Sequence, residues 1–125
     1  MNIKKFVVGS MFSMLLGSGV ANADWGDVYY CQMTNFNTVT LEGEKQNHPL
    51  EKFQFKLDQT KNAMVFGSTG FFGNSVSKLG DNWPSQEMWF ATTKYSTTYF
   101  EEGKLLSTNN TSLGAVVVSA DCDKF

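Results

Sequence analysis

A single histidine limits the catalytic chemistry that this sequence can support. A serine or cysteine nucleophile activated by an imidazole would have to use His48, because the chain holds no other histidine. His48 precedes Pro49 in a polar stretch, and no nucleophile motif surrounds any serine. We therefore expect His48 to be an exposed loop residue and the protein not to be an enzyme.

Pairs of carboxylates are the other groups that could perform acid–base chemistry or bind a cation. Glu101 and Glu102 adjoin Gly103, where a hairpin turn is expected, and Asp121 and Asp123 flank a cysteine. Neither pair has the spacing of a calcium-binding loop. We expect solvated surface groups, with no catalytic residue, no metal site and no other cofactor.

A glycine-rich segment with two adjacent aromatic residues is the best candidate for an interaction site. Residues 67–73 read Gly-Ser-Thr-Gly-Phe-Phe-Gly, without the lysine or the following helix that a phosphate-binding loop requires. In an extended chain Phe71 and Phe72 point to opposite sides, so one can anchor the core while the other meets a partner. Trp83, in the turn-rich segment 81–86, is the third candidate partner-binding residue.

Two cysteines, Cys31 and Cys122, lie 91 positions apart near the two ends of the chain. In an exported chain an even cysteine count favours a disulfide. A zinc site is the alternative, but two thiols and one histidine do not supply four protein ligands. The sequence therefore predicts one intramolecular bridge between Cys31 and Cys122.

The N-terminus has the order of a secretory signal peptide. Lys4 and Lys5 precede an apolar stretch, residues 6–20, which is shorter than the ~20 residues of a membrane span. The small residues that a signal peptidase recognises come next and end at Ala23, and a polar segment follows them. We predict a signal peptide over residues 1–23, cleavage between Ala23 and Asp24, and a periplasmic or secreted protein without a stable membrane anchor.

Charge narrows the classes of partner. Removing Lys4 and Lys5 from ten basic residues leaves a mature chain with twelve acidic residues and a formal charge of −4. Nucleic acid and anionic membranes both require a basic face, so neither is expected as a partner. The sequence does not identify the partner, which we expect to be a protein or a glycan. We expect a monomer.

Strand signals dominate the mature chain, residues 24–125, which we predict to be one β domain. The clearest is residues 52–58, where Phe53, Phe55 and Leu57 alternate with polar residues. We expect eight or nine short strands, with a break at residues 35–37, a loop over 42–50 and a turn over 109–114. The predicted cysteine bridge brings the first and last strands together, which favours an all-β, antiparallel up-and-down barrel of about eight strands; a β-sandwich is the alternative.

Sixteen aromatic residues in the mature chain could either fill a core or line a pocket. Eight short strands enclose little more than their own side chains. We therefore expect function on loops or on the outer surface, as a soluble binding module. A small-ligand carrier with an aromatic-lined interior is the alternative, and it requires an apolar pocket of a few hundred Å³.

The residues around the cysteines also carry a resemblance. Val28 to Cys31, residues 118–125 and the strand around Phe53 resemble a group of small exported bacterial proteins of unassigned function. A weaker resemblance is to periplasmic inhibitors of C-type lysozyme, small disulfide-bearing barrels that begin with a tyrosine close before a cysteine. It implies an inhibitor-like role, but Ser68 and Lys78 lack the fuller motif of the inhibitory loops.

Overall fold

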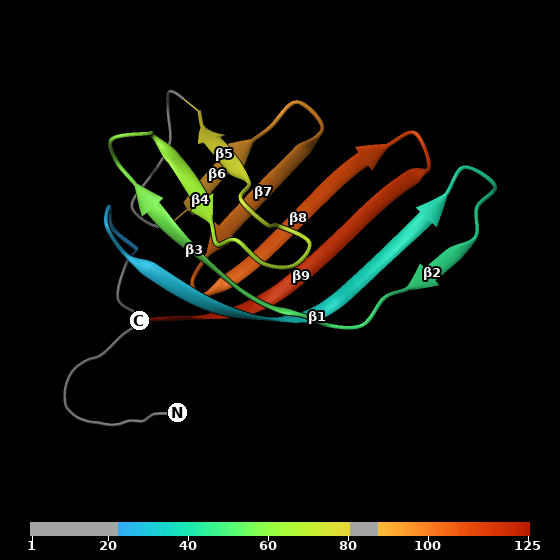
Figure 1. The fold of residues 1–125 in the computed structure, drawn as a ribbon, viewed down its shortest axis with the longest axis horizontal. Coiled ribbons are helices and arrows are strands. Elements are labelled where there is room, and N and C mark those ends of the chain that lie inside the picture. Colours follow the sequence, from blue (N-terminus) through green and yellow to red (C-terminus); the bar gives the residue numbers. More distant parts are fainter. Residues whose placement is uncertain (1–22, 81–87) are drawn as a thin grey trace.

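The computed structural model describes residues 23–80 and 88–125, and within them all regular structure is β. Figure 1 shows one continuous, strongly curved sheet. The strands are β1 (Val28–Thr40), β2 (Lys45–Asn47), β3 (Lys52–Asp58), β4 (Ala63–Phe66), β5 (Val76–Leu79), β6 (Met88–Thr92), β7 (Ser96–Glu101), β8 (Lys104–Thr111) and β9 (Gly114–Lys124). No helix in the described part of the chain is long and apolar enough to cross a membrane.

Eight of the strands close into an antiparallel up-and-down barrel, so the predicted fold is confirmed and the sandwich alternative is wrong. Strands β3 to β8 each pair with the next strand in the chain, and β1 pairs with both β3 and β9. The closing β1–β9 ladder is the longest, and it runs from Tyr29↔Lys124 to Thr40↔Gly114. The ninth strand, β2, pairs only with the far half of β1 and extends the wall beyond the barrel.

The predicted disulfide lies within the closing ladder. Cys31 of β1 is in register with Cys122 of β9, and their sulfur atoms are 2.12 Å apart. Both cysteines are buried. The bridge therefore joins the first and last barrel strands across the seam where the barrel closes.

The sequence prediction of a break at residues 35–37 is wrong, because β1 passes through this segment. A bulge between Met33 and Asn35 inserts one extra residue and lets the strand bend without losing its partner. Two further predictions differ from the structure for a similar reason, because polar residues that were expected to form a loop and a turn form strands on an exposed ribbon beyond the barrel. Strand β2 lies inside the expected loop, and the expected turn over 109–114 is reduced to Ser112 and Leu113.

Alternation places the core as expected for residues 52–58. In β3, Phe53, Phe55 and Leu57 are buried while the polar residues between them face solvent. Phe55 stacks on Tyr29 at 5.4 Å between ring centroids and meets Phe100 edge-on at 5.1 Å. This aromatic cluster fills the half of the barrel nearest the chain ends.

The other end of the barrel is defined by four connections. Strands β1, β4, β6 and β8 all run toward it, so it carries the turns β1–β2, β4–β5, β6–β7 and β8–β9. In Figure 1 the tips of β6–β7, β8–β9 and β1–β2 follow one another along the upper right. We call this end the mouth of the barrel.

Candidate functional site: the mouth of the barrel

The inner face of the barrel changes from aromatic to hydroxyl-bearing toward the mouth. Cross-strand pairing stacks the inward side chains of β6, β7 and β8 in successive layers. The layer nearest the chain ends holds Trp89, Phe100 and Leu105, all buried. The next layer holds Ala91, Thr98 and Ser107, and the layer at the mouth holds Thr93, Ser96 and Asn109. Polarity therefore rises step by step along one wall.

A cavity of about 90 Å³ opens where the polar layers begin. It is lined by residues from β5, β7, β8 and the adjoining loops: Phe71, Phe72, Ser75, Ser77, Thr93, Ser96, Thr98, Ser107 and Asn109. Ser77, Thr98 and Ser107 are buried. The hydroxyls of Thr98 and Ser107 hydrogen-bond to each other at 3.0 Å, whereas within the described residues the Ser77 hydroxyl has no hydrogen-bond partner.

The predicted aromatic loop roofs this cavity, and its two phenylalanines have different roles. Phe72 is only 6% exposed and packs on Phe53 and Phe66, each at 4.7 Å between centroids. Phe71 is half-buried and rests edge-on against Phe72 and Phe36, each at 5.0 Å. Phe72 is thus the core anchor and cannot serve as an exposed contact, while part of Phe71 remains accessible.

A carboxylate from the neighbouring segment holds the loop in place. The backbone N–H of Phe71 donates a hydrogen bond to Glu51 Oε1 at 2.8 Å. Gly70, with φ +77°, lies beneath that carboxylate, and a Cβ atom there would come within 2.6 Å of Glu51 Oε1. The positive φ favours glycine at this turn, and another residue there would also displace the Glu51 carboxylate. The loop is therefore fixed by a charged acceptor at its centre.

His48 lies beside the aromatic residues of the mouth. Its Nε2 atom is 2.8 Å from the hydroxyl of Thr38, and its ring lies 4.7 Å from that of Phe36. His48 lies in a loop as predicted, just after β2, but its side chain is half-buried rather than exposed because β2 brings it back onto β1. In the part of the chain that the structure describes, no acidic group contacts the other ring nitrogen, so this pair lacks the third member of a catalytic triad.

The rim of the mouth carries exposed apolar side chains at three hairpin tips. Leu113 at the β8–β9 tip is 78% exposed, and Tyr95 at the β6–β7 tip is 61% exposed. Leu41 follows β1 at the third tip, which adjoins that of β8–β9 because Thr40 pairs with Gly114. The three apolar tips therefore follow one another along one side of the polar interior, an arrangement suited to contact with a partner.

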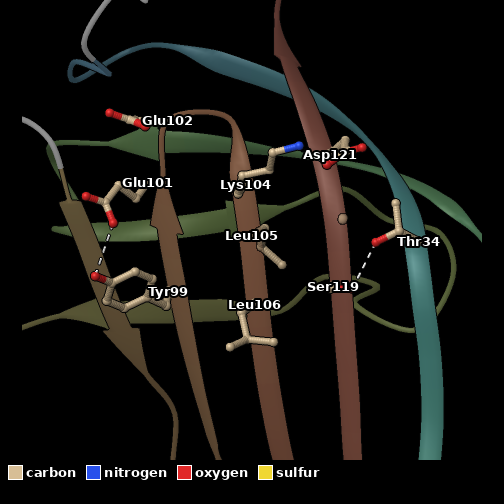
Figure 2. Close-up of a pocket in the computed structure, with 10 residues that line it drawn as sticks. Thr34, Tyr99, Glu101, Glu102, Lys104, Leu105, Leu106, Ser119 and Asp121 are labelled. Atoms are coloured by element: carbon tan, nitrogen blue, oxygen red, sulfur yellow. Dashed lines mark hydrogen bonds and ion pairs between the residues drawn. The ribbon is translucent and has the colours of Figure 1, made fainter.

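A second, larger hollow lies on the outside of the barrel over β7, β8, β9 and β1 (Figure 2). It measures about 360 Å³ and is open to solvent. Leu106 lies among the charged side chains of Glu101, Glu102, Lys104 and Asp121, and the Lys104 ammonium pairs with Asp121 at 2.7 Å. Carboxylates outnumber cations in this groove, which makes it suitable for a basic group of a partner.

The phenol of Tyr99 also faces the outer groove. Its hydroxyl contacts Met88 and donates a hydrogen bond to Glu101 Oε1 at 3.3 Å, as Figure 2 shows for the glutamate. Desolvation, followed by the charge and the hydrogen bond of Glu101, raises the pKa of Tyr99. The phenol therefore stays protonated at neutral pH and acts as a hydrogen-bond donor.

The two acid pairs considered from the sequence lie apart from the mouth. Glu101 and Glu102 are at the β7–β8 turn, and Asp121 and Asp123 are near the end of β9. Within residues 23–80 and 88–125 no group of three His, Cys, Asp or Glu side chains is placed to hold a metal ion. Trp83 and the loop 81–86 lie outside the described residues, as does the signal segment up to residue 22.

The three buried hydroxyl side chains of the cavity were missed by the sequence reasoning. Ser77, Thr98 and Ser107 lie on three different strands, and nothing in their local sequence marks them as neighbours. A partial signal exists, because Thr98 and Ser107 occupy inward positions of strands that alternate around Phe100 and Leu105. Comparisons of the chain with protein-family models, with curated proteins and with solved structures found no match.

Proposed function

We propose that this protein is an exported binding module that holds a protein or glycan partner at the mouth of its barrel. The observation that carries the proposal is the hydroxyl-lined cavity beneath an aromatic loop that Glu51 holds in place, with exposed apolar tips along one side of it. Thr98 and Ser107 hydrogen-bond to each other, whereas the Ser77 hydroxyl on the same cavity bonds to no described residue, and a hydroxyl left free at a cavity supports a role in binding.

Export rests on the N-terminal sequence and on the disulfide. A bridge of this kind persists in oxidising compartments such as the periplasm or the extracellular medium. Mass spectrometry of the protein recovered from its own host, without reductant, tests both features. We expect the mass of residues 24–125 less two hydrogens; retention of residues 1–23 would contradict export by this signal.

Photo-crosslinking in the native compartment tests the mouth as the binding surface. A benzophenone amino acid at Leu113 should form adducts, whereas the same probe at Phe125, on the opposite end of the barrel, should not. Tyr95→Ala should reduce the Leu113 adducts, while Tyr30→Ala, which removes an equally aromatic exposed side chain beside Phe125, should leave them unchanged. Adducts from Phe125 alone would place the partner elsewhere and refute the proposal.

The carrier alternative is less well supported by the interior. Aromatic side chains pack against one another through the half of the barrel nearest the chain ends, and the cavity at the mouth is about 90 Å³. A carrier of apolar molecules needs a pocket several times larger. Co-purification of an apolar small molecule in native mass spectrometry would revive that alternative.

The outer groove favours one second candidate, an inhibitor-like role toward an enzyme with a basic surface. Glu101, Glu102 and Asp121 give the groove an excess of negative charge, and the mature chain is also acidic. This agrees with the weaker resemblance to inhibitors of C-type lysozyme. An assay of C-type lysozyme activity with the wild-type protein and with Glu101→Gln/Glu102→Gln tests it, and inhibition unaffected by the double substitution would exclude the groove.

A further inference from the structure

The cavity at the mouth has a chemistry that selects among ligands. We propose that it binds an uncharged, hydroxyl-rich group, namely the hydroxymethyl-bearing edge of a sugar, through the hydroxyls of Ser77, Thr98 and Ser107. This inference rests on the proposed function, because it assigns a ligand class to the same mouth.

The absence of charge in the lining excludes ionic ligands. None of the described residues around the cavity is Asp, Glu, Lys or His; all are Phe, Ser, Thr or Asn. An unpaired charge buried there would lose its hydration without gaining a counter-ion. Phosphates, carboxylates and amines are therefore poor ligands for the enclosed part of the site.

The hydroxyls exclude a purely apolar ligand as well. In the bond between Thr98 and Ser107 one hydroxyl uses its only proton, which leaves acceptor positions on both side chains and a free donor on the other. Ser77 is 3% exposed as a residue and lines the cavity; its hydroxyl bonds to none of the described residues and is open to the cavity, since the buried side-chain polar atom that lacks a partner among them is Trp89 Nε1. A ligand hydroxyl can both donate and accept, as these side chains do, whereas an alkyl group would leave them unpaired.

Size and shape limit how much of a sugar can enter. A volume of about 90 Å³ holds roughly three water molecules, at about 30 Å³ each in the liquid. This is enough for a hydroxymethyl group and the ring atoms next to it, but not for a whole hexose. The rings of Phe71 and Phe72 line the same cavity and offer apolar faces to the C–H groups of such an edge.

Nuclear magnetic resonance titration of the oxidised mature protein tests the inference with defined probes. D-Glucose carries the hydroxymethyl group, D-xylose is the same ring without it, and D-glucose 6-phosphate carries a charge at that position. We expect D-glucose to shift the amide signals of Ser77, Thr98 and Ser107, D-xylose to bind about three- to tenfold more weakly, and the phosphate not to enter. No shift at these residues at roughly 100 mM D-glucose, where even a site of ~10 mM Kd is mostly filled, would overturn the inference.

Two substitutions identify the groups that bind. Ser77→Ala should weaken D-glucose about three- to tenfold, while Ser119→Ala, which removes a hydroxyl that bonds Thr34 on the outside of the barrel, should have no effect. Equal effects of the two substitutions would overturn the assignment. A crystal of the sugar-soaked protein with only water in the cavity would do the same.

The outcome separates this inference from the proposed function. If the sugars fail to bind but the Leu113 crosslinks persist and depend on Tyr95, the mouth binds a partner through its rim and only the ligand class is wrong. If D-glucose binds in the cavity and the crosslinks are absent, the cavity assignment stands and the rim contact fails.

Discussion

Removing the disulfide should destabilise the protein by about as much as a small domain can tolerate. The bridge closes a loop of 91 residues, for which the chain-entropy model gives about 4.6 kcal/mol at 25 °C. The double variant Cys31→Ala/Cys122→Ala should therefore lower the free energy of unfolding by about 4–5 kcal/mol. Total stabilities of small domains are about 5–15 kcal/mol, so the variant should remain folded but marginal.

The ladder around the bridge is the reason to expect a folded variant. Cys31 and Cys122 face each other within β1 and β9, and registered pairs continue on both sides of them. Native closure is thus encoded by backbone pairing, and the bridge acts mainly by restricting the unfolded chain. The thermal midpoint should fall by about 20 °C or more, at ~4–8 °C per kcal/mol.

Urea unfolding followed by tryptophan fluorescence measures this effect. Oxidised wild type, reduced wild type and the double variant form the comparison, and the variant should be insensitive to reductant. A variant within about 1 kcal/mol of the oxidised protein would refute the entropic argument, since its magnitude follows from loop length alone. Loss of the β signal in circular dichroism at 25 °C would instead show that the β1–β9 ladder cannot close the barrel by itself.

Three further predictions follow from single contacts. Burial, reinforced by the charge of Asp27, raises the pKa of Tyr29 to about 12, so the unfolded chain loses this proton near pH 10 while the folded protein keeps it. The free energy of unfolding should therefore fall by up to ~2–3 kcal/mol between pH 10 and 12. Tyr29→Phe should remove that part of the pH dependence in urea melts. Thr98→Val should lower the free energy of unfolding by about 1 kcal/mol because it breaks the hydrogen bond to Ser107, and adding Ser107→Ala should lower it little further. A double-mutant cycle measures this non-additivity, and independent effects of the two substitutions would contradict it. Glu51→Ala should speed hydrogen exchange at the Phe71 amide by about tenfold, since the lost hydrogen bond is worth ~1.5 kcal/mol. The amide of Gly67, which donates to the Gln54 carbonyl, is the control and should keep its exchange rate. Unchanged exchange at Phe71 would mean that Glu51 does not hold the loop.

Local alternation was enough to predict the barrel walls but not the ribbon beyond them. Phe53, Phe55 and Leu57 follow a period of two that any half-buried strand requires, and their positions in β3 agree with it. The polar residues of β2 and of the end of β8 carry no such period. Strand β2 forms because β1 continues past the bulge and offers it an edge, and the end of β8 forms because it pairs with β9; both are tertiary effects.

The candidate site was predictable only in part, for a related reason. The Gly-rich spacing around Phe71 and Phe72 indicated a loop with one buried and one accessible ring, and the buried one is Phe72. The chemistry beneath that loop depends on register between strands. Ser77 and Thr98 contribute to one cavity only because β5, β6 and β7 pair as they do, and a single sequence does not encode that register locally.

The strand that closes the barrel, β9, follows all the other barrel strands in chain order, and this has a consequence for folding. Until β9 is available, β1 and β8 both present long unpaired edges, and the pairing that seals the barrel joins residues about 90 positions apart. This closing ladder is the non-local pairing of the described sheet, so it should form slowly and only after β9 has emerged. A nascent chain whose barrel cannot close early stays unfolded, and an unfolded polypeptide is the form that passes through a narrow translocation pore.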